Sequence, residues 1–297
     1  QSLNNHNLME SRSLTGYEFG YIMTQDAWHI NDLTKVIDTI HHQDVQAFIP
    51  TLLSRLSSHG LIYGNIIKAE AMEIVRFFED ALIENTDLAA LDNENHTIQL
   101  GNQKHWIYQQ QVKDINSSIV SYYQYGPESM HMSAVQSLMG RIISQPFYNQ
   151  LRTKEQLGYV VYATDLNLNR VNGFRFVVQS SIKDPVFLEE RVEHFLKSYQ
   201  AEFADMSNER FEKYKNGLLR KLRVSAKNIQ EEFYRYWSQI SNHRYEFDWE
   251  DKFASELEKI TKEDVTKYYN NLFIKSPKQL TIQSFGSKHP LRKISKG

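Results

Sequence analysis

Residues 146–163 join a predicted helix to a predicted strand, and they constrain the fold more than any other part of the chain. Before this segment, apolar residues recur every three and four positions over residues 130–143, as on one face of a helix. Pro146 lacks an amide hydrogen and is expected to end that helix. Residues 159–163 form a β-branched and aromatic run typical of a strand, and Gly158 is the expected pivot between the two elements.

This junction carries two hydrogen-bond donors, the guanidinium of Arg152 and the phenol of Tyr159. Arg152 falls near the end of a helical or turn segment and Tyr159 opens a strand. Both groups are therefore held on a rigid junction from which they can reach the same oxygen atom. From residue types alone, the simpler interpretation is that Arg152 pairs with Glu155 and that Tyr159 fills the core.

The composition is that of a globular protein, because 41% of the 297 residues are hydrophobic and 12% are aromatic. The 34 basic and 36 acidic residues nearly balance, and no basic stripe is interleaved with aromatic residues, so no nucleic-acid partner is expected. No apolar run approaches the roughly 18 residues of a membrane span, so no membrane partner is expected either. The absence of cysteine excludes disulfides and thiol catalysis.

Two parts of the chain differ in character, and we predict one domain in residues 1–90 and another in residues 91–297. Residues 85–96 are polar and rich in turn-forming residues, which marks the boundary. Residues 1–15 are polar and are expected to be poorly ordered.

The first part is predicted to contain two amphipathic helices, with apolar faces over residues 45–56 and 69–82. Pro50 is expected to kink or break the first of them. Between the helices, residues 61–65 are predicted to form a short buried strand.

The second part is predicted to contain five strands together with several helices. Residues 169–173 predict a hairpin with Asn-Gly at its turn. Asp184 is the expected N-cap of a helix with proline at its first position, and Thr261 opens the last helix with a capping box. The strands are expected within residues 106–108, 119–123, 159–168, 174–180 and 280–285.

A helix start followed by a strand occurs twice at nearly the same spacing. Residues 43–45 precede the strand at residue 61, and residues 263–265 precede the strand at residue 280. We interpret these units as the closing helix and strand of two related domains, the first of which lacks its front half. The chain is thus expected to be a fragment of a tandem-repeat protein.

The sequence Leu-Arg-Thr-Lys-Glu-Gln-Leu-Gly-Tyr at residues 151–159 resembles a signature in the carboxy-terminal half of the pitrilysin/insulinase family of zinc metalloendopeptidases, which are of the inverted-zincin type. The resemblance continues in the same order through residues 48–56, 63–66 and 236–237. The fold class that it implies is α+β. The expected domain is pitrilysin-like, with an antiparallel sheet flanked by helices, and it follows the tail of a homologous domain.

The resemblance also implies how the activity is divided between two halves of an enzyme. In the family, four αβ domains close around a chamber that holds peptides, and only the amino-terminal half binds zinc, through His-x-x-Glu-His and a later glutamate. This chain is therefore expected to bind peptide substrates and a zinc-binding amino-terminal half, and to hold no cofactor itself. The family's matching arginine and tyrosine contact substrate near the scissile carbonyl, which implies catalytic roles for Arg152 and Tyr159.

A search for metal ligands agrees with this expectation. None of the eleven histidines begins a His-x-x-Glu-His or His-Glu-x-x-His sequence. His41 and His42 point about 100° apart on a helix, so we interpret them as solvated. Glu193 and His194 reproduce only the end of the inverted motif, and we interpret them as structural or solvated. A self-sufficient protease using this pair would instead show stoichiometric zinc.

Other candidate binding residues lie near the junction and on a later helix. Phe147 and Tyr148 are expected to line a substrate pocket, and core packing is the alternative for both. A basic stretch resembles loosely an anion-binding chamber wall of the family, with a solvated helix face as the alternative. Its residues are Arg220, Lys221, Arg223 and Lys227.

The functional hypothesis is therefore the non-zinc half of a metalloendopeptidase that degrades peptides in a closed chamber and is inactive alone. The alternative is a non-enzymatic module of the same fold that binds peptides or forms a homodimer, the latter through the surface meant for the missing half. By resemblance the compartment is the cytoplasm or the periplasm, and any targeting segment is expected to lie outside this chain.

Overall fold

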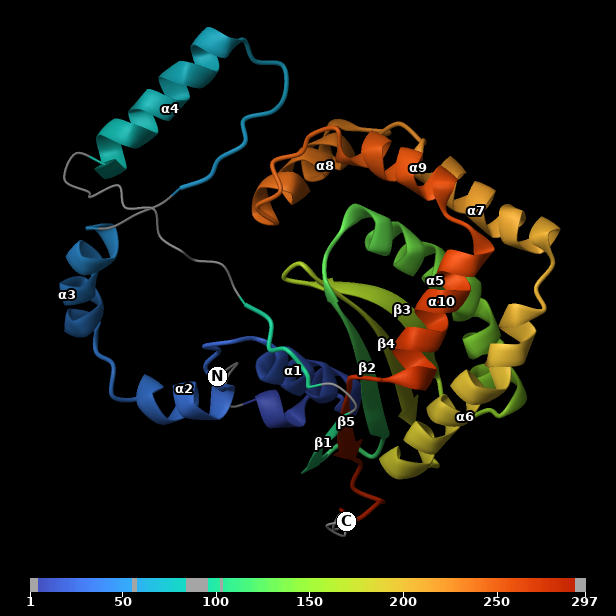
Figure 1. Ribbon diagram of the computed structural model, residues 1–297. Helices are drawn as coiled ribbons and strands as arrows, with labels where there is room; N and C mark the ends of the chain where they lie inside the picture. Colours follow the sequence, from blue (N-terminus) through green and yellow to red (C-terminus); the bar gives the residue numbers. More distant parts are fainter. Residues whose placement is uncertain (1–4, 55–57, 84–95, 102–103, 292–297) are drawn as a thin grey trace. The chain divides into compact units, whose positions relative to one another are not determined.

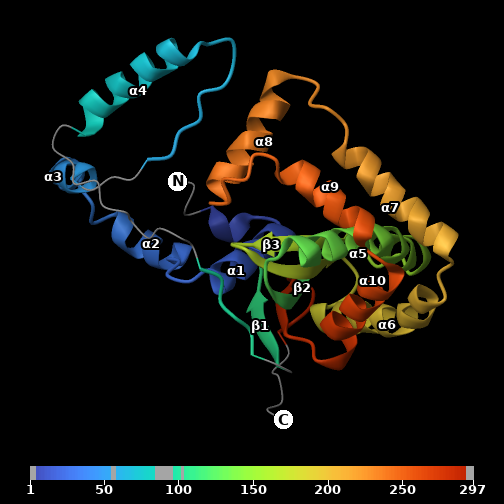
Figure 2. The ribbon, with the colours of Figure 1, turned by 45° about the horizontal axis from the view of Figure 1, so that its top comes forward.

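The computed structural model describes residues 5–54, 58–83, 96–101 and 104–291 (Figures 1 and 2). Its contacts divide the chain into two compact units. Residues 1–27, 96–224 and 250–297 form the first unit, and residues 28–95 and 225–249 form the second.

The first unit is built on a five-stranded sheet with the strand order β1-β5-β2-β4-β3. All five predicted strands are confirmed. β1 runs parallel to β5 and the other pairs are antiparallel, so the sheet is mixed where an antiparallel one was expected. The strands are β1 (His105–Gln111), β2 (Ser117–Pro127), β3 (Val160–Leu168), β4 (Val171–Ser180) and β5 (Gln279–Phe285).

Helices cover both faces of this sheet, as Figures 1 and 2 show. α1 (Ser11–Met23) packs on one face against β2 and β5. On the other face, α5 (Met130–Tyr148) lies against β3 and β4, and α6 (Pro185–Ala204) lies against β2 and β5. The unit also contains α7 (Asn208–Leu222), α9 (Trp249–Lys259), α10 (Lys262–Tyr269) and the π-helical segments η2 (Asn149–Lys154) and η3 (Asn270–Lys275).

The core has two layers because side chains alternate along each strand. Tyr122 of β2 packs against Phe19 of α1, with ring centroids 5.1 Å apart. The next residue, Tyr123, points to the opposite layer and meets Phe176 and Phe273 edge to face. The hydrophobic stabilisation is therefore shared between the two faces of one sheet.

The prediction that residues 1–15 are poorly ordered is wrong for the described residues, since α1 begins at Ser11. Small hydroxyl groups on α1 and the sheet form a buried cluster that periodicity does not reveal. The Ser11 and Thr15 hydroxyls lie 2.6 and 2.5 Å from that of Ser118, and Thr15 also donates to Ser284 at 2.7 Å. These bonds anchor a polar segment in the core without leaving unpaired groups.

The domain boundary predicted at residues 90 and 91 lies outside the described residues. The compact units do not follow it, because residues before 28 join the sheet unit. Whether residues 1–90 are the tail of a homologous domain stays a prediction.

The predicted hairpin and helix caps are present, but the turn of the hairpin lies at different residues from those predicted. Asn169 and Arg170 make the turn between β3 and β4, with φ of 47° and 63°, whereas Asn172 and Gly173 lie within β4. Gly173 marks a close approach, since a Cβ there would lie 2.5 Å from the Tyr122 ring. Caps at the starts of α6 and α10 are confirmed.

The second unit contains α2 (Ile30–Ile37), α3 (His42–Leu53), α4 (Lys68–Ile83) and α8 (Ile229–Ser241). The two helices predicted from periodicity correspond to α3 and α4, although α3 continues through Pro50. Their apolar faces are open to solvent, with Phe48 56% and Phe78 57% exposed. The predicted strand at residues 61–65 is wrong. A strand needs a hydrogen-bonding neighbour, and the described residues of this unit contain no other strand.

Among the described helices, none combines the length and the hydropathy needed to cross a bilayer.

Candidate functional site

The junction between α5 and β3 is a π-helical segment, η2, that follows α5 without a break. Contrary to expectation, α5 continues past Pro146 to Tyr148, and the amide of Asn149 bonds to the carbonyls of both Gln145 and Pro146. The burial of Phe147 outweighs the missing hydrogen bond at the proline. The wider π turn places Arg152 in its last turn, just before the chain changes direction.

Gly158 allows the chain to enter β3 beside β4. A Cβ at this position would lie 1.7 Å from the backbone carbonyl oxygen of Gln179, so any side chain would push the two strands apart. The expected pivot is therefore present, and its cause is the close approach of two backbones. Tyr159 follows directly and stands at the start of β3.

Glu155 anchors the loop between η2 and β3. Its carboxylate accepts two hydrogen bonds from Arg191 of α6, at 2.8 and 2.9 Å, and one from Gln150 at 2.8 Å. These bonds hold the pKa of Glu155 below its usual value, mainly through the bond to Arg191. Glu155 is thus bound to Arg191, and the expected alternative of an Arg152–Glu155 pair does not form.

Arg152 and Tyr159 lie together at the surface. The guanidinium carbon of Arg152 is 5.7 Å from the centre of the Tyr159 ring, which is a cation–π distance. Tyr159 is 85% exposed, so it does not fill the core. Within the described part of the chain, neither side chain has a hydrogen-bond or carboxylate partner. Both donors are therefore free to bind an acceptor supplied from outside.

Phe147 and Tyr148 are adjacent but have different surroundings. Phe147 is fully buried and packs on Phe176 and Phe195, with ring centroids 5.0 and 5.2 Å away. A direct substrate contact by Phe147 is not compatible with this burial, so we assign it to the core that supports η2. Tyr148 is exposed and lines a surface cavity.

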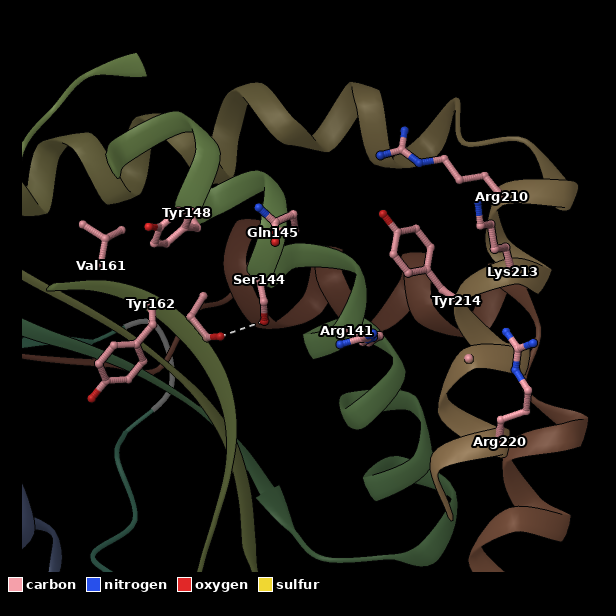
Figure 3. A pocket seen from close by; sticks show the side chains of 12 residues that line it. Arg141, Ser144, Gln145, Tyr148, Val161, Tyr162, Arg210, Lys213, Tyr214 and Arg220 are labelled. Atoms are coloured by element: carbon pink, nitrogen blue, oxygen red, sulfur yellow. Dashed lines mark hydrogen bonds between the residues drawn. The ribbon is translucent and has the colours of Figure 1, made fainter. Parts of the chain in front are cut away.

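This cavity has a volume of about 800 Å³ and lies between α5, β3 and α7. Figure 3 shows its walls, which are made by one side of α5 and the facing side of α7. No carboxylate lines it. Its cationic lining residues are Arg141, Arg210, Lys213 and Arg220.

Of the four cations expected to bind anions, only Arg220 reaches this cavity. Arg223 pairs with Glu258, the backbone amide of Lys227 bonds to Glu231, and Lys221 is not among the lining residues. The sequence analysis missed Arg141, Arg210 and Lys213. A usable signal existed on α7, because positions 210, 213, 217 and 220 repeat at the spacing of one helical face.

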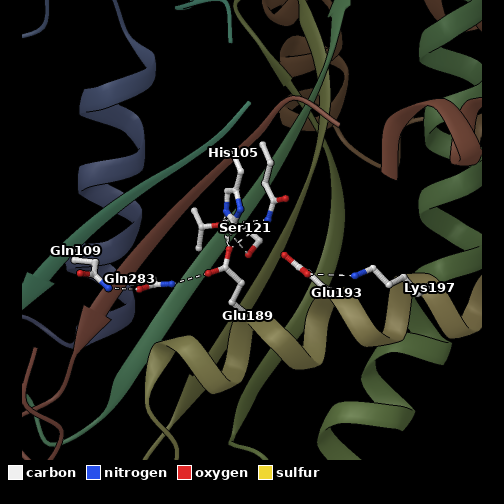
Figure 4. Close-up of polar contacts among 9 residues, drawn as sticks. His105, Gln109, Ser121, Glu189, Glu193, Lys197 and Gln283 are labelled. Carbon is white, nitrogen blue, oxygen red and sulfur yellow. Dashed lines mark hydrogen bonds and ion pairs between the residues drawn. The ribbon is translucent and has the colours of Figure 1, made fainter. Parts of the chain in front are cut away.

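Glu193 also differs from its expected setting. Its carboxylate lies close to His105 of β1 and Glu189 of α6, and His194 is not part of this group (Figure 4). From the sequence, the adjacent carboxylates of Glu189 and Glu190 are expected on the solvated face of a helix, and this is wrong for Glu189, which is buried. His105 was not predicted as a site residue. The Glu-x-x-x-Glu spacing of residues 189–193 puts both carboxylates on one side of a helix.

Comparison with known proteins places these features in a family. A model described as PQQ synthase PqqF-like, C-terminal lobe domain 4, matches residues 138–237, which include the C-terminal part of α5, the junction and the residues that line the basic cavity. Human insulin-degrading enzyme is 35% identical over 277 residues, which is 92% of this chain. The chain is homologous to metallopeptidases of the insulinase family. It spans 27% of the length of that relative.

Solved structures agree with this homology at the level of the fold. Pitrilysin superposes with a TM-score of 0.81 at 22% identity, covering 97% of this chain and 30% of the pitrilysin chain. The peptidase M16 inactive domain from Pseudomonas fluorescens superposes with a TM-score of 0.65 at 16% identity, covering 95% of this chain and 66% of that one. The fold is thus pitrilysin-like, and the chain corresponds to a C-terminal domain of the family.

The insulinase family consists of zinc metallopeptidases, but the residues of this chain do not fit the zinc site of the inverted-zincin type. The sequence contains no His-x-x-Glu-His. Across the described residues, the one gathering of three potential ligand side chains is His105, Glu189 and Glu193, which come from two separate elements. No catalytic step can be assigned to a family-type zinc ion held by this chain.

Proposed function

We propose that this chain is the non-zinc C-terminal half of an insulinase-family endopeptidase, and that Arg152 and Tyr159 bind the peptide beside its scissile bond. In this proposal the zinc-binding half is a separate polypeptide segment. The two halves enclose peptides in a chamber, and the chain is inactive alone.

The observation that carries the proposal is the arrangement of Arg152 and Tyr159. Both donors stand on a junction that is fixed by Glu155 and by the buried Phe147, and neither donor has a partner in the described chain. Donors that are already oriented stabilise a developing oxyanion without reorganisation. An arginine and a tyrosine side by side suit the oxyanion of a tetrahedral intermediate in peptide hydrolysis.

The exposed apolar faces of α3 and α4 support the requirement for a second segment. Large hydrophobic patches on a soluble protein mark surfaces that another chain segment covers. The chain spans only 27% of the length of human insulin-degrading enzyme. The rest of such a protein is long enough to cover the apolar faces of α3 and α4.

Reconstitution tests this function. The chain is mixed with a separately produced amino-terminal half of an insulinase-family relative that contains His-x-x-Glu-His, and cleavage of a fluorogenic peptide is followed. We expect no cleavage by the chain alone, and zinc-dependent cleavage by the mixture well above that of the amino-terminal half alone. Equal activity with and without the chain would contradict the proposal.

The second candidate is a non-enzymatic, dimerising module that binds peptides. It is favoured by the superposition on a domain described as inactive. Gel filtration with and without peptide distinguishes the two proposals. A stable homodimer that adds nothing to the activity of the amino-terminal half supports the module.

We further propose that the basic cavity binds anionic groups of a substrate or effector. Isothermal calorimetry with tripolyphosphate is expected to show binding that Arg220→Ala weakens at least fivefold, because that change removes one of the lining cations. Arg223→Ala is the matched control, since Arg223 is paired with Glu258. The absence of binding heat, or equal weakening by both changes, would contradict the assignment.

A further inference from the structure

The face of the sheet beneath α6 carries polar side chains where apolar ones are expected. β5 contributes Gln279, Thr281 and Gln283 to this face, and all three are buried. Each donates a hydrogen bond to the carboxylate of Glu189. The bond from Gln283 Nε2 to Oε2 is 2.5 Å long and that from Gln279 Nε2 to Oε1 is 3.3 Å, while the Thr281 hydroxyl also bonds to Oε1.

These bonds fix the carboxylate but do not neutralise it. Glu189 is only 6% exposed, and the described chain offers it no lysine or arginine partner. A buried carboxylate is costly unless it is paired with a cation or coordinates a metal ion. Its one basic neighbour is His105 of β1, whose Nε2 lies 2.8 Å from Glu189 Oε1 and 3.1 Å from the Thr281 hydroxyl.

A third ligand atom completes the group. Glu193 lies one helical turn after Glu189 on the same side of α6, and its carboxylate is 3.5 Å from Lys197. One ligand atom each from His105, Glu189 and Glu193 lie within 4.8 Å of one another, as Figure 4 illustrates. Glu189 is buried, whereas the side chains of His105 and Glu193 are partly exposed, so the group opens to solvent on one side.

We propose that His105, Glu189 and Glu193 bind one divalent transition-metal ion of the zinc class. One imidazole and two carboxylates are donors that zinc accepts, and three protein ligands leave a fourth position for water. The ion would lie beside His105 Nε2 and Glu189 Oε1, which are 2.8 Å apart, and histidine binds zinc through a ring nitrogen that carries no proton. Gln283 and Thr281 orient the ligand carboxylate from behind.

The metal ion would link two elements of the fold. His105 stands on β1, which is an edge strand of the sheet, and both glutamates stand on α6. An ion shared by them fixes the edge strand to the covering helix. The ligands of this site differ from those of the His-x-x-Glu-His site of the family, and the site does not depend on the proposed peptidase function.

The test is zinc binding by the 297-residue chain. The protein is stripped with a chelator, dialysed into zinc-buffered solution and measured by plasma mass spectrometry, and its affinity is determined by competition with a chromophoric zinc indicator. We expect one zinc ion per chain. His105→Gln and Glu193→Gln are each expected to weaken binding at least tenfold, and Thr281→Val about tenfold through loss of the orienting bond.

His131→Gln is the matched control. His131 also lies 2.8 Å from a glutamate, Glu256, but no third ligand joins that pair. The zinc affinity of the His131→Gln variant is expected to equal that of the unaltered chain. Zinc should raise the Tm of this control variant but not the Tm of His105→Gln. The proposal would be overturned if the unaltered chain held less than about a tenth of an equivalent of zinc. It would also be overturned if His131→Gln and His105→Gln lost zinc affinity to the same extent. Glu193→Gln alters a partly exposed side chain, so unchanged zinc binding by this variant would also overturn it even if His105→Gln failed to fold.

Discussion

Replacing Arg152 by alanine is expected to lower kcat of the reconstituted peptidase by about 100- to 1,000-fold, the usual effect of losing one oxyanion donor. Tyr159→Phe removes a single hydroxyl group and should cost a similar factor. Both side chains lie at the surface, and neither has a hydrogen-bond or carboxylate partner in the described chain. Each variant should therefore fold as the unaltered chain does. Peptide cleavage under saturating conditions, together with zinc content, provides the measurement.

Lys154→Ala is the control for this pair, because Lys154 is an exposed cation on the same π-helical segment. It should leave kcat within about twofold, which distinguishes a directed donor from general positive charge. If kcat falls mainly because the halves no longer associate, KM and the concentration of chain needed for half-maximal activity will change as well. Unchanged turnover in both Arg152→Ala and Tyr159→Phe would remove these residues from the mechanism.

Phe147→Ala is expected to destabilise the folded chain by about 3–5 kcal/mol, the range for removing a large buried ring. The ring is fully buried between Phe176 and Phe195, so its loss leaves a cavity beneath η2. The free energy of unfolding in urea, followed by tryptophan fluorescence and circular dichroism, gives the value.

Tyr148→Ala provides the comparison, since the two aromatic residues are neighbours and only one is buried. Its cost is expected to stay below about 1 kcal/mol, as for most changes on the surface. Equal costs for the two substitutions would contradict the assignment of Phe147 to the core and Tyr148 to the cavity wall.

Most elements of the sheet unit follow from local sequence, because each is determined by periodicity and by its end signals. The five strands, the start of α6 at Asp184 and the capping box at Thr261 all belong to this class. α1 could not be found in this way. Besides the packing of Phe19 on Tyr122, α1 is anchored by hydroxyl groups of Ser11 and Thr15 that bond to residues more than a hundred positions away, and such pairs leave no periodic pattern.

Pro146 shows how tertiary packing overrides a local signal. Proline disfavours a helix interior, yet α5 continues through it and places Phe147 in the aromatic core. The strand predicted at residues 61–65 fails for the opposite reason. Its local pattern is suitable, but hydrogen bonds to a neighbouring strand are required, and no described strand of that unit provides them.

The candidate site was predictable only in part. The family signature points to Arg152 and Tyr159, and the structure adds that both are free at the surface. The separation of Phe147 from Tyr148 could not be predicted, because adjacent residues at the end of a helix differ only in the direction of their side chains. His105 and Glu189 meet through the parallel pairing of β1 with β5, which is a long-range feature.

The π-helical geometry of η2 makes the length of this segment as important as its residues. A π turn contains one residue more than the α-helical turn that it replaces, and removing one residue commonly restores the α-helix. Such a deletion before Arg152 would replace the π turn by an α-helical turn of 3.6 residues and change the direction in which the guanidinium points. Two homologues with the same arginine and tyrosine but a one-residue difference here would present different surfaces to a peptide. Gaps at this position in an alignment therefore separate homologues that keep the paired donors from homologues that have lost them.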